Sequence, residues 1–224
     1  MFGQDEFAST FNVSHETIDK LAHYQTLLSR WNRTINLVSK PSLEHLWHRH
    51  FADSAQLIAH IPNTVERIVD FGSGAGLPAI VLAVMRPDID YMLIESDRRK
   101  SIFLQTLIHE LKLKKIIIKN DRIENINLVE SGVEKSGKSP ASLLFTARAF
   151  APLGSILHLI EQLYQNSTIH ESNQSRQLLL LKGESAPTEL TEAEQSWYVQ
   201  YRTMASITKA EAVILKIDHF NKLL

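Results

Sequence analysis

Two carboxylates and three closely spaced glycines are the residues whose types and spacing point most directly to chemistry. Gly72, Gly74 and Gly76 alternate with small residues just after Asp70, and Glu95 follows about twenty residues beyond the last glycine. Because glycine has no Cβ atom, the backbone at such positions can adopt positive φ and a ligand can approach it closely. Carboxylates beside that turn accept hydrogen bonds or attract a cationic group. The pattern predicts a binding site for a small molecule.

A strand, a turn and a helix must position these residues. An apolar, β-prone run precedes the turn, formed by Ile68, Val69 and Phe71. Pro78 suits the first turn of a following helix, because its missing N–H needs no partner there. A strand that runs into a glycine turn and a helix forms a ligand cradle at the carboxyl edge of a parallel sheet. Glu95 ends the next predicted strand.

The whole chain alternates strand and helix patterns, which predicts an α/β fold with a doubly wound, mostly parallel sheet. Further strands are predicted at 91–95, 115–119, 143–146, 177–181, 197–203 and 212–217, and helices at 14–31, 42–61, 98–113 and 155–164. Ile102 is expected to face inward, and solvated loops are expected at 131–140 and 165–176. We divide the chain into a helical extension, residues 1–62, and a sheet domain, residues 63–224.

The composition excludes several kinds of site. The 224-residue chain contains no cysteine, which excludes disulfides, thiolate metal sites, iron–sulfur clusters and cysteine nucleophiles. Its formal net charge of −1 gives no overall bias towards nucleic acid, so a surface that binds a polyanion must be a local patch. Residues 1–10 lack the basic and apolar regions of a signal peptide, and the longest apolar run, 77–85, is too short to span a membrane. We expect a cytoplasmic monomer without membrane contact.

Two cofactor classes compete for the glycine turn. A dinucleotide fingerprint reads G-x-G-x-x-G and binds a pyrophosphate, whereas here Gly74 and Gly76 are one residue closer and Asp70 would repel that group. The Asp70 carboxylate suits S-adenosylmethionine, whose amino acid end carries an ammonium group. Glu95 fits both classes, because it can accept hydrogen bonds from ribose hydroxyls. S-adenosylmethionine is therefore favoured, with a nicotinamide-dependent oxidoreductase, or a turn that only lets the helix pack, as the alternatives.

Five short segments, which lie within about residues 24–217, carry a resemblance to a known family. Two segments, WNRTINL at 31–37 and RHFADS at 49–54, resemble W-N-x-x-x-N-L and R-H-x-x-D-S. DFGSGAGLP at 70–78 resembles D-V-G-[ST]-G-x-G-[FL]-P, TARAFA at 146–151 resembles S-R-A-F-A, and the Lys182-Gly183 pair follows a strand as the family's K-G does. The family is the bacterial ribosomal RNA small-subunit methyltransferase G, also called glucose-inhibited division protein B. The R-H-x-x-D-S and R-A-F-A segments make the match specific.

The resemblance implies a class I S-adenosylmethionine-dependent methyltransferase with a Rossmann-like, seven-stranded sheet. It implies methyl transfer to N7 of a guanine, position 527, in the 530 loop of 16S rRNA. The product is S-adenosylhomocysteine, and the partner is the small ribosomal subunit. Carried over by position, Gly72 and Leu77 contact the cofactor at the turn. Ile123 and Glu124 flank the adenine, and Arg148 lies beside the cofactor and the target.

The residue types agree with methylation of a ring nitrogen. Methylation of cytosine C5 needs a cysteine nucleophile and radical methylation needs a cysteine-bound cluster, and the chain has no cysteine. Exocyclic amines are commonly methylated beside an Asn/Asp-Pro-Pro-aromatic loop, whereas residues 147–150 read ARAF. Guanine N7 carries an in-plane lone pair, so catalysis can consist of alignment and electrostatic control. We expect Arg148 to position guanine O6 or a phosphate, with a structural ion pair as the other interpretation.

A polar group lies on the helix predicted before the sheet. Arg49, His50 and Asp53 can share one face, either to dock the helix on the sheet or to cover the cofactor and contact RNA. The spacing does not discriminate between these interpretations. His45, His48 and His50 do not converge on one helix face, so we predict no metal site.

A basic patch is the other candidate for contact with RNA. Arg98, Arg99 and Lys100 begin one predicted helix and can meet rRNA phosphates, although a solvated surface explains such charges equally well. Two further functions stay open besides the oxidoreductase. One is methyl transfer to another acceptor, such as a small molecule or a protein. The other is a non-catalytic, rRNA-binding assembly factor.

Overall fold

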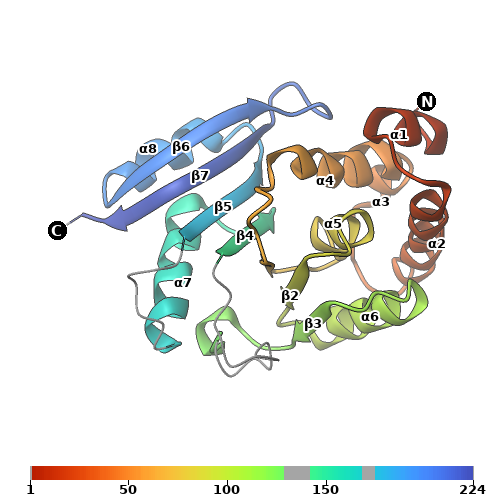
Figure 1. Cartoon of the computed structure of the whole chain (residues 1–224), viewed down its shortest axis with the longest axis horizontal. Coiled ribbons are helices and arrows are strands. Elements are labelled where there is room, and N and C mark those ends of the chain that lie inside the picture. The colour runs from red at the N-terminus through yellow and green to blue at the C-terminus, as the bar shows by residue number, and fades with distance from the viewer. Residues whose placement is uncertain (1, 129–141, 168–174, 224) are drawn as a thin grey trace.

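The chain folds around a mixed sheet with helices on both faces (Figure 1). The computed structural model describes residues 2–128, 142–167 and 175–223, and within them the sheet has seven strands in the order β3-β2-β1-β4-β5-β7-β6. The strands are β1 (Arg67–Phe71), β2 (Asp90–Ile94), β3 (Ile116–Lys119), β4 (Ser142–Arg148), β5 (Ser175–Lys182), β6 (Trp197–Ala205) and β7 (Val213–Lys222). β1 to β5 are parallel, whereas β7 is antiparallel to its neighbours β5 and β6. The predicted doubly wound, mostly parallel sheet is confirmed.

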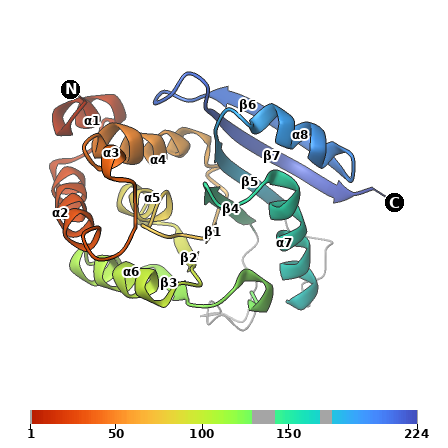
Figure 2. The same cartoon turned by 180° about the vertical axis from the view of Figure 1, so that it is seen from behind.

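Helices precede the sheet and connect its strands. They are α1 (Gln4–Phe11), α2 (His15–Trp31), α3 (Lys40–Leu43), η1 (Trp47–Ala52), α4 (Asp53–Ala55), η2 (Gln56–His60), α5 (Ala79–Met85), α6 (Arg98–Glu110), η3 (Ile123–Asn125), α7 (Leu153–Asn166) and α8 (Ala186–Glu194). Both views show α1 to α4 in the half of the molecule that contains α5 and α6, with α7 and α8 at the β5–β6 side of the sheet (Figures 1 and 2). None of the helices in the described ranges has the length and apolar composition needed to cross a membrane.

Two apolar cores cover the two faces of the sheet. Side chains alternate between the faces of a strand, so Ile68 enters one core and its neighbour Val69 enters the other. The core around Ile68 also contains Tyr24 of α2 and Phe51 of η1. The helices before β1 therefore pack on the sheet through shared apolar contacts. The division of the chain at residue 62 stays a prediction.

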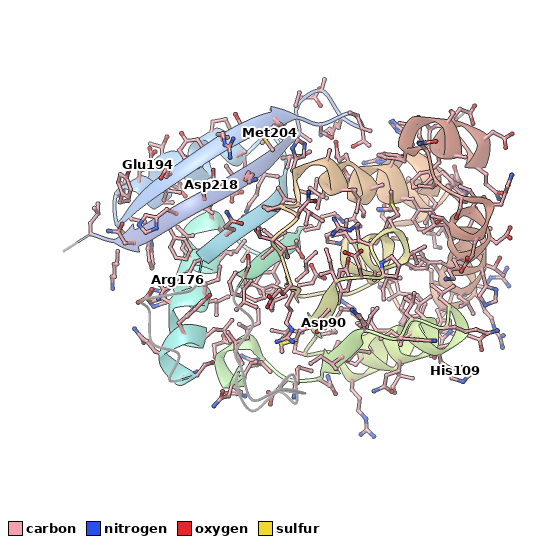
Figure 3. All side chains as sticks on the ribbon, in the orientation of Figure 1. Asp90, His109, Arg176, Glu194, Met204 and Asp218 are labelled. Carbon is pink, nitrogen blue, oxygen red and sulfur yellow. The ribbon has the colours of Figure 1, made fainter. Side chains whose placement is uncertain are left out.

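β1 lies at the point where the sheet reverses its strand order. Its last residue, Phe71, pairs with Ile94 at the end of β2 and with Ala147 near the end of β4. The carboxyl ends of three parallel strands therefore meet at one edge, which is where folds of this class bind ligands. Asp90, labelled in Figure 3, begins β2 and marks the opposite edge.

The single helix predicted over 42–61 is wrong, because this segment is broken into four short helical pieces. The π-helix η1 and the 3₁₀-helix η2 flank the short α4. Polar side chains here bond to backbone carbonyls: Ser54 Oγ donates to O of His50 at 2.7 Å, and Gln56 Nε2 donates to O of Asp53 at 3.1 Å. Such bonds compete with a regular helical ladder, which an apolar spacing pattern does not register.

Other predictions need smaller corrections. α1 and α8 are not among the predicted helices. Ile102 is 43% exposed, because Leu104 and Leu107 define the inward face of α6. The loop predicted at 131–140 lies outside the described residues. The loop predicted at 165–176 is wrong at its ends, which belong to α7 and β5.

Candidate active site

A cavity of about 1470 Å³ opens at the carboxyl edge of the sheet. Its walls come from the helices before β1, the glycine turn, the segment after β4, the β5–α8 turn and the β6–β7 turn. The charged residues in its lining are Arg49, Asp53, Lys100, Arg148, Lys182, Glu189 and Lys209. Basic residues outnumber carboxylates in this described lining, so the cavity suits an anionic or polyanionic ligand.

The glycine turn has a left-handed backbone at all three glycines. Gly72, Gly74 and Gly76 have φ values of +61°, +53° and +88°. The described lining of the cavity includes Gly72 and Gly74 but not Gly76. A Cβ atom at Gly76 would lie 2.6 Å from Cγ1 of Ile80, and one at Gly72 would lie 2.4 Å from Cδ2 of Phe150. Gly76 therefore lets α5 pack on the turn, whereas Gly72 exposes backbone beside the cavity.

Glu95 joins the glycine turn to the end of β2. Its carboxylate is buried, with Oε2 accepting from N of Gly74 and Oε1 accepting from N of Asp97, both at 2.8 Å. A carboxylate oxygen has more than one lone pair, so each retains capacity for a hydroxyl donor. Glu95 thus fixes the turn and keeps acceptor capacity for a ribose.

Asp70 is a buried carboxyl group beneath the turn. Its Oδ1 accepts a hydrogen bond from Oγ1 of Thr146 at 2.8 Å, and its Oδ2 has no partner among the described residues. Burial raises the pKa of Asp70 to about 7, against the opposing effects of the Ser73 and Thr146 hydroxyls. Asp70 does not belong to the described lining of the cavity, but its unpartnered buried oxygen fits a cationic ligand group, such as an ammonium.

Arg148 connects the end of β4 to the polar group before the sheet. Its Nη1 donates to Nδ1 of His50 at 2.8 Å and to O of Arg49 at 3.4 Å, and lies 3.4 Å from Oδ2 of Asp53. The ion pair considered as the alternative interpretation is therefore present. Arg148 also lines the cavity, so the ion pair and a role towards a ligand are compatible.

The other predicted residues either line the cavity or lie outside its described lining. Leu77, Lys100, Arg49 and His50 line it. Arg98 and Arg99 are exposed at the start of α6 and lie outside its described lining. Their roles with cofactor or RNA stay predictions.

Ile123 and Glu124 lie on η3, after β3. Ile123 is buried in the core on the α7 side of the sheet, and Glu124 is exposed, with its backbone oxygen accepting from Nδ2 of Asn166 at 2.8 Å. Neither residue belongs to the described lining of the cavity. Their contact with an adenine stays a prediction.

A partly buried ion pair between the end of β5 and α8 was not among the predicted site features. Nζ of Lys182 donates to Oε2 of Glu189 at 2.6 Å and to O of Ala151 at 2.8 Å, and the same carboxylate oxygen accepts from N of Leu153 at 2.9 Å. This pair fixes the segment that follows Arg148. A lysine at the end of an apolar strand needs such a counter-charge, which was the available signal.

Two aromatic residues were also missed. The buried hydroxyl of Tyr24 on α2 donates to O of Ala75 in the glycine turn. Phe150 is 38% exposed and lines the cavity beside Gly72. The signal for Tyr24 was its hydroxyl in an apolar stripe, because a buried tyrosine hydroxyl usually has a partner.

Solved structures that resemble this chain are methyltransferases. One is a SAM-dependent methyltransferase from Aquifex aeolicus, with a TM-score of 0.54, 10% identity, and coverage of 87% of this chain and 98% of that one. Another is TYW2 of M. jannaschii in complex with AdoMet, with a TM-score of 0.51, 14% identity, and coverage of 85% and 80%. At such low identity these similarities show the fold alone, and they confirm the predicted class I methyltransferase architecture.

Proteins related in sequence identify the family, which the shared fold alone does not. The profile of the family GidB, described as rRNA small subunit methyltransferase G, matches residues 17–217. A protein named ribosomal RNA small subunit methyltransferase G from Rhodospirillum centenum is 36% identical over 218 residues, which are 97% of this chain and 91% of the relative. A protein of the same name from Rickettsia rickettsii is 37% identical over 212 residues, which are 95% and 98% of the two chains. These matches confirm the resemblance stated from the motifs, and the chain belongs to the rRNA small subunit methyltransferase G family.

Proposed function

We propose that this protein transfers a methyl group from S-adenosylmethionine to N7 of the guanine at position 527, in the 530 loop of 16S rRNA. One observation supports this most directly. Arg148, from the R-A-F-A segment, contacts His50 and Asp53, from the R-H-x-x-D-S segment, at the wall of the cavity. The two segments most specific to the family thus meet beside the glycine turn. The names of the relatives support small-subunit rRNA as the acceptor.

The residues at the sheet edge fit the cofactor. Asp70 offers a buried oxygen without a partner to the ammonium group, and Glu95 offers acceptor capacity to the ribose hydroxyls. Gly72 and Gly74 leave the backbone open beside the cavity. S-adenosylmethionine supplies a methyl group made electrophilic by the sulfonium, and S-adenosylhomocysteine is the product.

The side chains of this site bind and orient rather than transfer protons. Guanine N7 attacks with its own lone pair, so the protein needs no general base for that step. Within the described residues, every contact of the Arg148 side chain uses Nη1. A guanidinium carries five N–H donors, so Arg148 retains donors on Nε and Nη2 for guanine O6 or a phosphate. Rate enhancement then comes from alignment of the two reactants.

Cations at the cavity wall support an RNA acceptor. Arg49 is exposed and Lys100 is half-buried, and both line the cavity. Arg98 and Arg99 extend this positive surface along the start of α6. Such side chains neutralise phosphates, so we expect binding to rRNA to weaken as salt rises.

A labelling experiment tests the proposal. The protein is incubated with methyl-labelled S-adenosylmethionine and small ribosomal subunits that lack the modification, and the label is mapped by base. We expect label at position 527 of 16S rRNA. Gly74→Asp is expected to abolish it, because the new carboxylate adds bulk and negative charge beside Glu95. Gly154→Asp is the matched control, because no heavy atom lies within 4 Å of a Cβ atom there.

Three outcomes contradict the proposal. Label in a metabolite or protein pool but not in 16S rRNA indicates another acceptor. A Gly74→Asp protein that still binds rRNA and retains its cellular role indicates a non-catalytic assembly factor. Tight binding of NADH without binding of S-adenosylmethionine, measured by calorimetry, indicates an oxidoreductase.

The proposal extends to the setting of the reaction. We propose that the protein acts on the small ribosomal subunit as a cytoplasmic monomer without membrane contact. Sedimentation of the purified protein tests the monomer, and cell fractionation tests the location. A stable dimer or membrane-bound activity contradicts this part.

A further inference from the structure

The π-helix η1 places a histidine between the helices before β1 and the end of β4. Trp47 and Phe51 of η1 pack in the core, with ring centroids 5.0 Å apart. His50 lies between them in sequence and is only 8% exposed. π-helical segments are rare and frequently occur at functional sites. This local geometry brings the His50 ring to Arg148 of β4.

The His50 ring lies closer to Arg148 than the carboxylate of Asp53 does. Nη1 of Arg148 lies 2.8 Å from Nδ1 of His50 but 3.4 Å from Oδ2 of Asp53. At the first distance the hydrogen bond is well formed, whereas the second is an ion pair without ideal geometry. Asp53 therefore balances the charge of Arg148, and His50 sets the direction of its guanidinium.

The protonation of His50 follows from its partners. A guanidinium only donates, so Nδ1 must be the acceptor and the neutral ring carries its proton on Nε2. Nε2 lies 2.9 Å from Oγ of Ser42, and that hydroxyl in turn donates to O of Ser39 at 2.8 Å. Each group thus donates to the next, from Arg148 to Ser39. Burial, reinforced by the positive charges of Arg148 and Arg49, lowers the pKa of His50 to about 3, so the ring is neutral at pH 7.

We propose that His50 is a positioning residue for methyl transfer, which orients Arg148 at the cavity wall so that its remaining donors are available to the target nucleotide. This inference rests on the proposed function. It assigns His50 a role through Arg148, whose guanidinium it contacts, although the 8% exposed His50 also belongs to the described lining of the cavity. Ser42 acts one step further away, by fixing the tautomer of the ring.

A double-mutant cycle tests this role with small ribosomal subunits as substrate. His50→Leu is expected to lower kcat by about 10- to 100-fold, since a misplaced group near the reaction centre has effects of that size. His50→Asn is expected to restore most of kcat, because its amide oxygen can replace Nδ1 as the acceptor. In an Arg148→Met background, His50→Leu is expected to have no further effect. The affinity for S-adenosylmethionine is expected to stay unchanged.

His109→Leu is the matched control. The side chain of His109 is 89% exposed at the last turn of α6, where Figure 3 labels it. This variant is expected to have wild-type activity. A second measurement, the ¹⁵N NMR spectrum of the His50 ring, is expected to show the Nε2–H tautomer. Ser42→Ala is expected to shift it towards Nδ1–H and to lower kcat, since that tautomer cannot accept from Arg148.

The outcomes separate the two proposals. Wild-type protein that does not methylate 16S rRNA overturns the proposed function, and this inference with it. Wild-type methylation combined with additive losses in the double mutant overturns this inference alone. The Nδ1–H tautomer in the wild type, or an equal loss of cofactor affinity in His50→Leu, overturns it as well. If His50→Leu does not fold, His50→Asn and Ser42→Ala still decide the question.

Discussion

Asp70 is a buried carboxyl group whose charge opposes folding at neutral pH. The residue is 1% exposed, and among the described residues its Oδ2 has no hydrogen-bond partner. Asp70→Asn keeps the shape and an acceptor for Thr146 but removes the charge. We expect this substitution to stabilise the protein at neutral pH and to weaken cofactor binding. The two effects have opposite signs because the buried charge of Asp70 destabilises the ligand-free fold but stabilises a bound ammonium group.

The size of the stability effect follows from the pKa of Asp70. This pKa is raised from 3.8 to about 7, mainly by burial. Between these values the native protein retains a proton that the unfolded chain has lost, so native stability falls as pH rises from about 4 to about 7. The difference corresponds to about 4 kcal/mol. Above pH 7 the penalty is fully present and does not grow further.

Urea unfolding of both proteins between pH 4 and pH 8 measures this effect. The wild type alone is a poor probe, because the lowered pKa of His50, about 3, makes stability rise with pH up to about 6.5 and opposes the Asp70 effect. The difference between Asp70→Asn and wild type removes the His50 contribution. We expect that difference to increase by about 4 kcal/mol from pH 4 to pH 8. Asp121→Asn, at an exposed carboxylate with a lowered pKa, is expected to lack this rise.

Calorimetry with S-adenosylmethionine measures the second effect. Loss of a hydrogen bond to a charged group costs about 1.5–3 kcal/mol, so Asp70→Asn is expected to weaken binding by about 10- to 100-fold. A stability difference that stays constant with pH refutes the argument that the native fold raises the pKa of Asp70. Unchanged affinity refutes its assignment to the ammonium group.

Two further predictions concern the glycine turn. Gly72→Ala and Gly74→Ala should each destabilise the protein by about 1–2 kcal/mol in urea unfolding, because both place an L residue at positive φ. Gly72→Ala should cost more, because its Cβ atom meets Phe150, and equal costs, or an excess that persists in a Phe150→Ala background, would contradict this contact. Tyr24→Phe should destabilise by about 1–3 kcal/mol, because O of Ala75 loses its buried donor, and an unchanged unfolding midpoint would show that this bond contributes nothing.

The sheet could be predicted because its strands carry strong local signals. Apolar β-prone runs such as Leu178–Leu181 and the alternation with helices identify buried parallel strands without any tertiary information. The break between α3 and η2 could not be predicted in this way. It depends on hydrogen bonds of Ser54 and Gln56 to backbone carbonyls, which a spacing pattern does not contain. Sequence periodicity therefore finds a helical segment more readily than the irregularities within it.

The residues of the candidate site could be predicted from the sequence, but the contacts between distant residues could not. Asp70, Gly72 and Glu95 lie at or just after the ends of neighbouring strands, so their meeting at one edge follows from the parallel fold. The contact between Arg148 and His50 joins residues 98 positions apart and depends on how η1 packs against β4. Only family-specific motifs pointed to both residues, and no spacing rule linked them.

The segment before β1 contacts the candidate site as well as the apolar core. It reaches the cradle at two points, through the hydroxyl of Tyr24 on the glycine turn and through His50 on Arg148. The first contact lies on the side of the cavity proposed for the cofactor, and the second lies on the side proposed for the acceptor. A glycine turn on a parallel sheet is generic to many methyltransferases. Selectivity for one RNA base is therefore expected to depend on the geometry of Arg148, which residues outside the sheet determine.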